Sequence, residues 1–136
     1  MFNRPFDDQG QIRIRLESEA KLYIQDQIFM GNLQLVWSYI IGFENSKNPH
    51  DERRNAIQKW KKIASVHIVE DGNILLQANQ LLRYGIKAKD ALHVASALEA
   101  KADYFLTTDN RLISGIKRSG VIKALTPIEY IEVLEK

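Results

Sequence analysis

The spacing of apolar residues predicts a long N-terminal helix. After an opening turn-like stretch, apolar residues recur near helical spacing between residues 11 and 30, as Ile12, Leu16 and Leu22 illustrate. Gly31 and the asparagine after it end this pattern, because glycine is the residue that most readily accepts the backbone conformation beyond a helix. The first predicted element is therefore a helix over residues 11–30.

Beyond this helix, short apolar runs alternate with segments of helical periodicity. Strands are predicted over residues 33–38, 66–70, 104–108 and 121–125. Helices are predicted over residues 39–45, 50–65, 73–84, 87–101, 110–119 and 126–135. Such alternation is typical of βα units, in which helices cover both faces of a mostly parallel sheet. We therefore predict an α/β fold with three layers, α/β/α, formed as one domain by residues 1–136.

Composition restricts the class of protein. The chain has 136 residues, of which 45% are hydrophobic and 26% charged, as in soluble globular domains. No apolar run approaches the roughly 20 residues of a membrane span, and the first residues do not resemble a signal peptide. Cysteine is absent, which excludes disulfides, thiolate metal sites and cysteine nucleophiles. We expect a cytoplasmic protein without a membrane partner, and the net charge of +2 neither requires nor excludes nucleic acid.

Asp109 stands directly after the predicted strand 104–108. In α/β sheets, ligands bind beyond the carboxyl ends of the strands, so this carboxylate is a candidate site residue. Strand alternation places Thr107 on the same side as Asp109. The alternative is that Asp109 caps the following helix by accepting hydrogen bonds from backbone N–H groups.

Asp90 lies near the start of the alanine-rich helix predicted over residues 87–101. Its neighbours on the same helical face are His93, Val94 and Ala97, a mostly small and apolar set. A carboxylate that points toward such an interior is costly unless a partner compensates its charge. The alternative is a first-turn acid that the helix dipole stabilises. His93 is a candidate base or ligand, although a packed, hydrogen-bonded histidine is the more common case.

Glu44 follows the predicted strand 33–38 by one short helix. Ile40 and Ile41 precede it by one helical turn, so the acid lies on an apolar stripe. The alternative is an ordinary surface glutamate.

Together, these three acids predict a metal site. The fold rule brings the ends of parallel strands to one edge of the sheet, where Glu44, Asp90 and Asp109 would repel one another without a cation. Oxygen ligands suit Mg²⁺ or Mn²⁺ better than zinc. A metal ion in such a site activates water and neutralises charge on a scissile phosphate, which is the chemistry of phosphodiester hydrolysis.

Basic residues form two groups that could contact phosphates. One lies on the predicted helix 50–65, and the other follows Asp109, where Arg111 is the best candidate. The alternative is that both groups are ordinary solvated helix faces. The two groups are Arg53, Arg54, Lys59, Lys61 and Lys62, and Arg111, Lys117 and Arg118.

The segment KDALHVASALEAKADYFLTTDNRLI resembles the second half of a PIN domain, the nuclease fold of VapC-type toxins. In that family an Asp begins the alanine-rich helix and a T-x-D motif ends the next strand, which here correspond to Asp90 and to Thr107 with Asp109. Glu44 matches the family's acid in the short helix after the second strand. The resemblance implies a Mg²⁺- or Mn²⁺-dependent ribonuclease, with RNA and an antitoxin protein as partners.

One family feature is not found. PIN domains open with a central strand that ends in a catalytic Asp, whereas here Met1 stands almost directly before NRPFDD. We therefore expect a chain truncated before that strand, and neither Asp7 nor Asp8 is expected to replace its acid. The loss would expose the edges of strands 33–38 and 104–108, and exposed edges favour pairing with another chain in a homo-oligomer. It also leaves open a catalytically silent PIN-like domain that binds RNA or a protein.

Overall fold

The structure is a computed structural model that describes the backbone of residues 4–135 and the side chains of residues 10–135. Its helices are α1 (Arg4–Phe29), α2 (Tyr39–Ser46), α3 (Asp51–Ile63), α4 (Gly72–Leu81), the 3₁₀ turn η1 (Leu82–Tyr84), α5 (Ala88–Glu99), α6 (Asn110–Ser119) and α7 (Pro127–Leu134). Its strands are β1 (Val36–Ser38), β2 (Val66–Ile68), β3 (Tyr104–Leu106) and β4 (Lys123–Leu125). Helices and strands alternate as predicted, which confirms the α/β class.

Two element boundaries differ from the predictions. The opening stretch is not a turn, because α1 begins at Arg4. Pro5 is compatible with this early start, since the first turn of a helix does not use its N–H groups. The strands have three residues each and are shorter than the apolar runs that predicted them. Apolar runs mark buried segments, and only part of each run enters a ladder of hydrogen bonds.

The strands form two separate parallel pairs within the part of the chain that the structure describes. In the first pair Val36 of β1 lies opposite Val66 of β2, and in the second Tyr104 of β3 lies opposite Lys123 of β4. Parallel pairing is therefore confirmed, whereas residues 4–135 do not form one continuous sheet. The predicted loss of a central strand is not tested by these pairings and stays a prediction.

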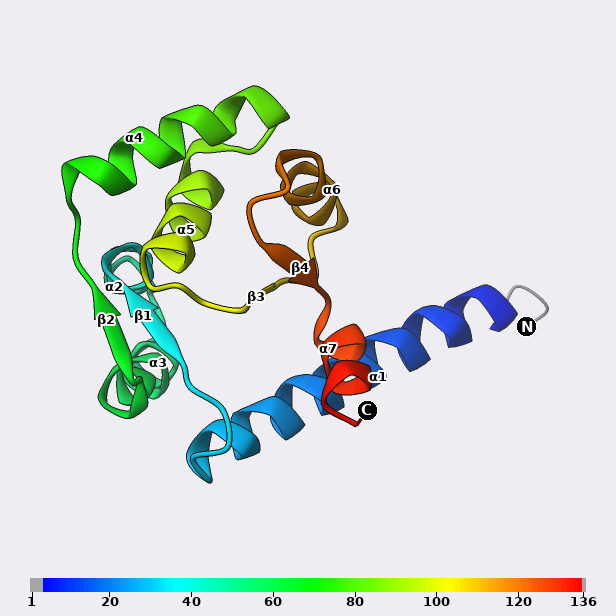
Figure 1. Cartoon of the computed structure of the whole chain (residues 1–136). Coiled ribbons are helices and arrows are strands. Elements are labelled where there is room, and N and C mark those ends of the chain that lie inside the picture. The colour runs from blue at the N-terminus through cyan, green and yellow to red at the C-terminus, as the bar shows by residue number, and fades with distance from the viewer. Residues whose placement is uncertain (1–3, 136) are drawn as a thin grey trace.

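Helix α5 forms the centre of the hydrophobic core. Its small residues allow close packing, above all against α4, and Ala91, Val94 and Ala95 are fully buried. Ile74 of α4 and Ile116 of α6 complete this core from two sides. In Figure 1, α5 lies between the β1–β2 pair and the β3–β4 pair, so it connects the two halves of the fold.

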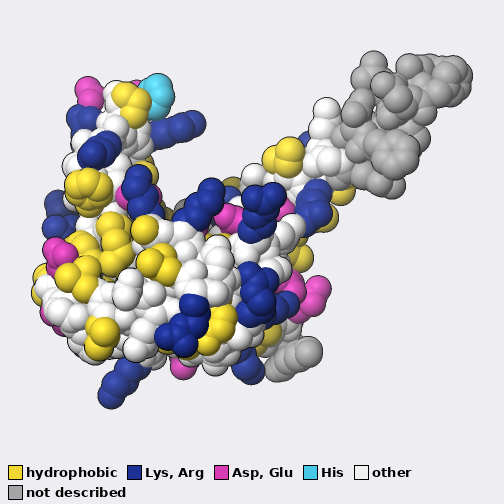
Figure 2. Space-filling view, turned by 90° about the horizontal axis from the view of Figure 1, so that it is seen from above, with side chains coloured by type: hydrophobic (Ala, Val, Ile, Leu, Met, Phe, Trp, Pro, Cys, Tyr) yellow, Lys and Arg dark blue, Asp and Glu magenta, His cyan; other side chains and the backbone are white. Residues whose placement is uncertain are grey.

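Helix α1 lies apart from this core. Its main partner is α7, and its N-terminal part projects away from the other elements (Figure 1). Several of its apolar side chains are therefore exposed to solvent. The space-filling view in Figure 2 shows lysine and arginine side chains spread over one face of the molecule, with hydrophobic side chains between them. Across residues 4–135, no helix combines the length and the apolar character that crossing a bilayer would require.

Candidate functional site

Glu44 occupies the C-terminal part of α2, the helix that follows the carboxyl end of β1. Its carboxylate contacts Nε2 of His93, which lies on α5. The Glu44 side chain is 41% exposed and the His93 side chain 21%, so the pair lies at the border between core and solvent. Glu44 is therefore a partly exposed acid with a histidine partner, which leaves open both readings of this residue.

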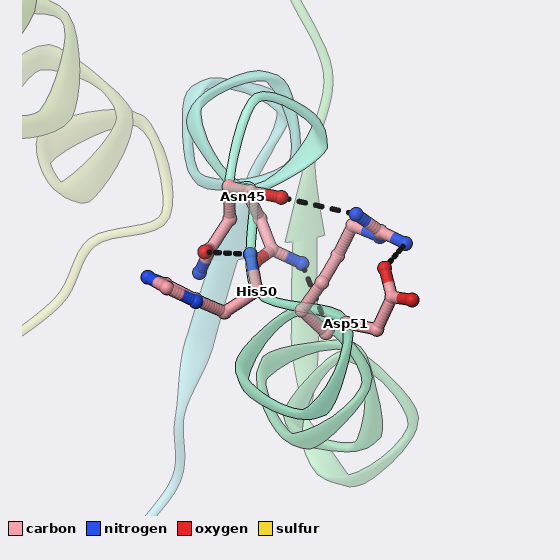
Figure 3. Close-up of polar contacts among 5 residues, drawn as sticks. Asn45, His50 and Asp51 are labelled. Carbon is pink, nitrogen blue, oxygen red and sulfur yellow. Dashed lines mark hydrogen bonds and ion pairs between the residues drawn. The ribbon is translucent and has the colours of Figure 1, made fainter.

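Hydrogen bonds between polar groups fix the end of α2 against the start of α3. Asn45 is almost fully buried, and its Nδ2 donates to the backbone oxygen of Arg54 over 3.1 Å. The Arg54 guanidinium donates to the backbone oxygen of Asn48 and to the carboxylate of Asp51. Asn48 in turn accepts a hydrogen bond from the backbone N–H of His50, as Figure 3 shows. These contacts hold the short helix that carries Glu44 in one place.

Asp90 lies in the first turn of α5, and it is half-buried. No side chain caps this helix, so the negative charge of Asp90 is placed favourably near the positive end of the helix dipole. His93 follows on the same helix, one turn later. Residue 90 therefore fits the predicted helical position, which agrees with both readings that the sequence left open.

Asp109 is the N-cap of α6. Its Oδ1 accepts hydrogen bonds from the backbone N–H groups of Arg111 at 3.0 Å and Leu112 at 3.2 Å. Thr107 supports the same loop, because its Oγ1 accepts a hydrogen bond from the backbone N–H of Asp109 at 3.1 Å. The structure thus has the capping arrangement that the sequence left as an alternative, and only one carboxylate oxygen takes part in it.

The described residues do not gather all predicted acids at one point. Among the side chains of residues 10–135, no group of three or more His, Asp or Glu residues is arranged to hold a metal ion. Glu44 meets His93, whereas Asp109 follows β3, which belongs to the other strand pair. Oxygen ligands of this kind suit Mg²⁺ or Mn²⁺ in their chemistry. Their arrangement in this structure does not form a complete metal site.

The carboxyl end of β2 carries groups that the sequence interpretation missed. Asp71 caps α4 by accepting a hydrogen bond from the N–H of Ile74, and Glu70 precedes it. Burial raises the pKa of the nearby Tyr39 hydroxyl above its usual value, and the negative charges of Glu70 and Asp71 raise it further. The Tyr39 hydroxyl is buried without a hydrogen-bond partner in the described part of the chain. Glu70 ends the predicted strand 66–70 and Asp71 follows it directly, and this position was a signal that could have identified both acids.

A match to a known protein family shows which family this chain belongs to. The family model described as PIN domain matches residues 9–117, well over half of the sequence. The chain belongs to the PIN domain family. No curated protein and no solved structure gives a significant match.

Family membership confirms the resemblance read from the residues between Lys89 and Ile113. PIN domains are in general nucleases that bind divalent metal ions and RNA. This PIN domain carries Glu44, Asp90, Thr107 and Asp109 within the matched range, and their roles stay predictions.

Proposed function

We propose that this PIN domain is a metal-dependent ribonuclease that hydrolyses phosphodiester bonds in RNA. Glu44, Asp90 and Asp109 are the proposed acidic residues and metal ligands, and Thr107 is proposed to orient the loop that carries Asp109. The family match supports nuclease chemistry in general. The contact between Glu44 and His93 carries the proposal further, because it joins α2 to the helix whose first turn contains Asp90.

Mg²⁺ or Mn²⁺ is the proposed ion, since the candidate ligands are carboxylates. Such an ion would supply a water of lowered pKa and offset charge on the phosphate. Thr107 contributes by fixing the backbone of Asp109, and the Asp109 cap leaves one carboxylate oxygen outside the helix hydrogen bonds. An RNA substrate also makes the cytoplasm the expected place of action.

The experiment is an RNA cleavage assay with and without Mn²⁺. We expect cleavage that needs the ion, and a loss of about 100-fold or more in Asp90→Asn and Asp109→Asn. Asp26→Asn is the control, because this aspartate lies on α1, far along the chain from the proposed site, and its substitution removes the same charge. Undiminished cleavage in either site variant would reject the acidic site.

A second candidate function is a catalytically silent PIN domain that binds RNA or a protein. The observation that favours it is the arrangement of the acids: Asp109 caps a helix, and the described side chains form no group of three metal ligands. Titration calorimetry with Mn²⁺ separates the two functions. Binding tighter than millimolar favours the nuclease, and binding no stronger than a millimolar background favours the silent domain.

We also propose that the chain forms a homo-oligomer through α1. Ile12, Leu16 and Tyr23 form an exposed apolar stripe on this helix, with exposed fractions of 57%, 49% and 41%. Arg15 and Glu19 lie beside the stripe, one helical turn apart. If two copies pack antiparallel, Arg15 of each copy faces Glu19 of the other, so the surface is complementary to itself. The role of a VapC-type toxin with an antitoxin partner is a further proposal that rests on the sequence resemblance.

A further inference from the structure

We propose that the outer face of α3 binds the backbone of single-stranded RNA and leads it toward the proposed site. The inference rests on the proposed ribonuclease function, because it names where the substrate of that site is held. The face lines a shallow hollow of about 680 Å³ together with β2. Its lining residues on α3, called the α3 row below, are Asn55, Gln58, Lys59, Lys61 and Lys62, and His67 of β2 completes the lining.

The positive charges of the α3 row are free to meet a polyanion. The acids of α3, Asp51 and Glu52, lie in its first turn, at the other end of the helix from the lysines. Within residues 10–135, the structure has no ion pair between a carboxylate and Lys59, Lys61 or Lys62. Three lysines within four consecutive residues, none with a carboxylate partner, form a surface on which phosphates release bound counterions.

The spacing of the row suits a single strand whose bases are stacked. Asn55, Gln58, Lys59 and Lys62 follow one another at intervals of three, one and three residues, so they lie on one face of the helix. The seven steps from Asn55 to Lys62 extend for about 10 Å along the helix, which is roughly the length of three stacked nucleotides at ~3.4 Å each. The amide groups of Asn55 and Gln58 can donate to and accept from base edges, while the lysines meet phosphates.

His67 adds an aromatic surface to the same hollow. It is exposed on β2, and its Nε2 lies 2.7 Å from the backbone oxygen of Lys61. A carbonyl oxygen only accepts, so Nε2 carries the hydrogen and the ring is held in place beside the row. A fixed, exposed ring can stack on a base, which is how proteins commonly hold unpaired nucleotides.

The opposite face of α3 is occupied, which leaves the row as the free side of the helix. Trp60 packs against Phe29 of α1 with ring centroids 4.7 Å apart. At its other end α3 joins α2 through the hydrogen bond between Asn45 and Arg54. A strand that lies along the row and continues toward the start of α3 therefore reaches the helix that carries Glu44.

The test measures binding separately from cleavage. Fluorescence anisotropy follows a labelled single-stranded RNA of about 12 nucleotides in EDTA, so that no metal-dependent cleavage occurs. The variant K59Q/K61Q/K62Q is expected to bind about 10-fold or more weakly than the wild type. The slope of log affinity against log salt concentration should be smaller in magnitude by about 2, since each lost phosphate contact removes about 0.7 from the slope. Circular dichroism confirms that each variant is folded.

A matched control removes the same charge elsewhere. K21Q/K101Q/K123Q substitutes three exposed lysines outside α3 and outside both basic groups, and it should keep the wild-type salt dependence. An equal loss in both triple variants, or no loss in K59Q/K61Q/K62Q, would overturn the proposal. His67→Ala should weaken binding about 5-fold without changing the salt dependence, because stacking does not release counterions. Binding of a polyglutamate peptide as tight as that of RNA would also overturn it, since the row would then recognise acidic protein.

Failure of this inference and failure of the proposed function give different results. Asp90→Asn should bind the labelled RNA at least as tightly as the wild type, since Asp90 lies outside the α3 row and the substitution removes a negative charge. If this variant still cleaves RNA, the acidic site is wrong and the row is unaffected. If K59Q/K61Q/K62Q binds RNA normally while Asp90→Asn no longer cleaves, the row is wrong and the site stands.

Discussion

Glu44 and His93, which are 49 residues apart in the sequence, meet through the glutamate carboxylate and the histidine Nε2. Glu44 lies near the end of α2 and His93 lies one turn after Asp90 on α5. The contact joins the helix after β1 to the central helix of the core. It also makes His93 a hydrogen-bonded partner of a carboxylate, the more common of the two roles considered for this residue.

We predict that Glu44 and His93 stabilise the fold cooperatively. In a double-mutant cycle with Glu44→Gln and His93→Gln, urea unfolding should give a coupling free energy of about 0.5–1.5 kcal/mol, because the two groups share one hydrogen bond. Additive losses in the double variant would show that the contact is not formed in solution. A cycle of Glu44→Gln with Glu99→Gln is the control, because Glu99 bonds Asn73 instead.

We predict that substitutions at Asp109 separate stability from activity. Asparagine is as good an N-cap as aspartate, so Asp109→Asn should keep the stability of the fold, whereas Asp109→Ala should lose about 1 kcal/mol. Both variants should lose RNA cleavage if Asp109 belongs to the site. Thermal unfolding measures the first effect and the cleavage assay the second. If Asp109→Asn is active and Asp109→Ala is inactive only to the extent that it unfolds, the residue is a cap and nothing more.

We predict that Gly115 of α6 tolerates no side chain. A methyl group there would lie 2.8 Å from Cγ1 of Ile86 and 3.3 Å from the backbone oxygen of Tyr84. Ile86 is buried, so it cannot move away freely. Gly115→Ala should therefore lower the free energy of unfolding by about 1–3 kcal/mol. Gly72→Ala is the control, because a methyl group there meets nothing within 4 Å, and its stability should stay the same or rise slightly.

We predict a pH-dependent contribution from the cap of α7. The backbone N–H of Thr126 donates to the Glu129 carboxylate and lowers the pKa of Glu129 below its ordinary value of 4.5. A lowered folded-state pKa stabilises the fold above the unfolded pKa, and the contribution is lost as pH falls through the folded pKa. The stability difference between wild type and Glu129→Gln should thus shrink between about pH 6 and about pH 3. A difference that is constant over this range would contradict the assignment.

We predict that self-association depends on the α1 stripe. Leu16→Glu should shift the chain toward the monomer in analytical ultracentrifugation, whereas Leu76→Glu, at an exposed position of α4, should not. Arg15→Glu and Glu19→Arg should each weaken association, because each puts like charges opposite one another. An equimolar mixture of these two variants should associate again. Monomers in the wild type at all concentrations, or no recovery in the mixture, would reject this surface.

Much of the fold could be predicted from local patterns. The alternation of apolar runs with helical periodicity correctly identified the parallel α/β class, and Gly31, which has a left-handed backbone, marked the end of the first helix. The start of α1 was missed, because a proline near a chain start reads as a turn although the first helical turn accepts it. The division into two strand pairs was missed as well, since strand partners depend on packing between distant segments.

Some features of the candidate site could likewise be predicted from local patterns, and others depend on tertiary packing. Residue types and spacing predict Glu44, Asp90 and Asp109 as site residues, because acids on apolar faces or at strand ends are unusual and this is visible along the chain. Thr107 joins them through strand alternation, and the roles of all four residues stay predictions. Periodicity and capping are properties of a few neighbouring residues, so the sequence by itself determined the elements and the positions of these groups within them. Only the tertiary structure decided that Glu44 meets His93 while Asp109 caps α6, because those contacts follow from how α2, α5 and β3 pack.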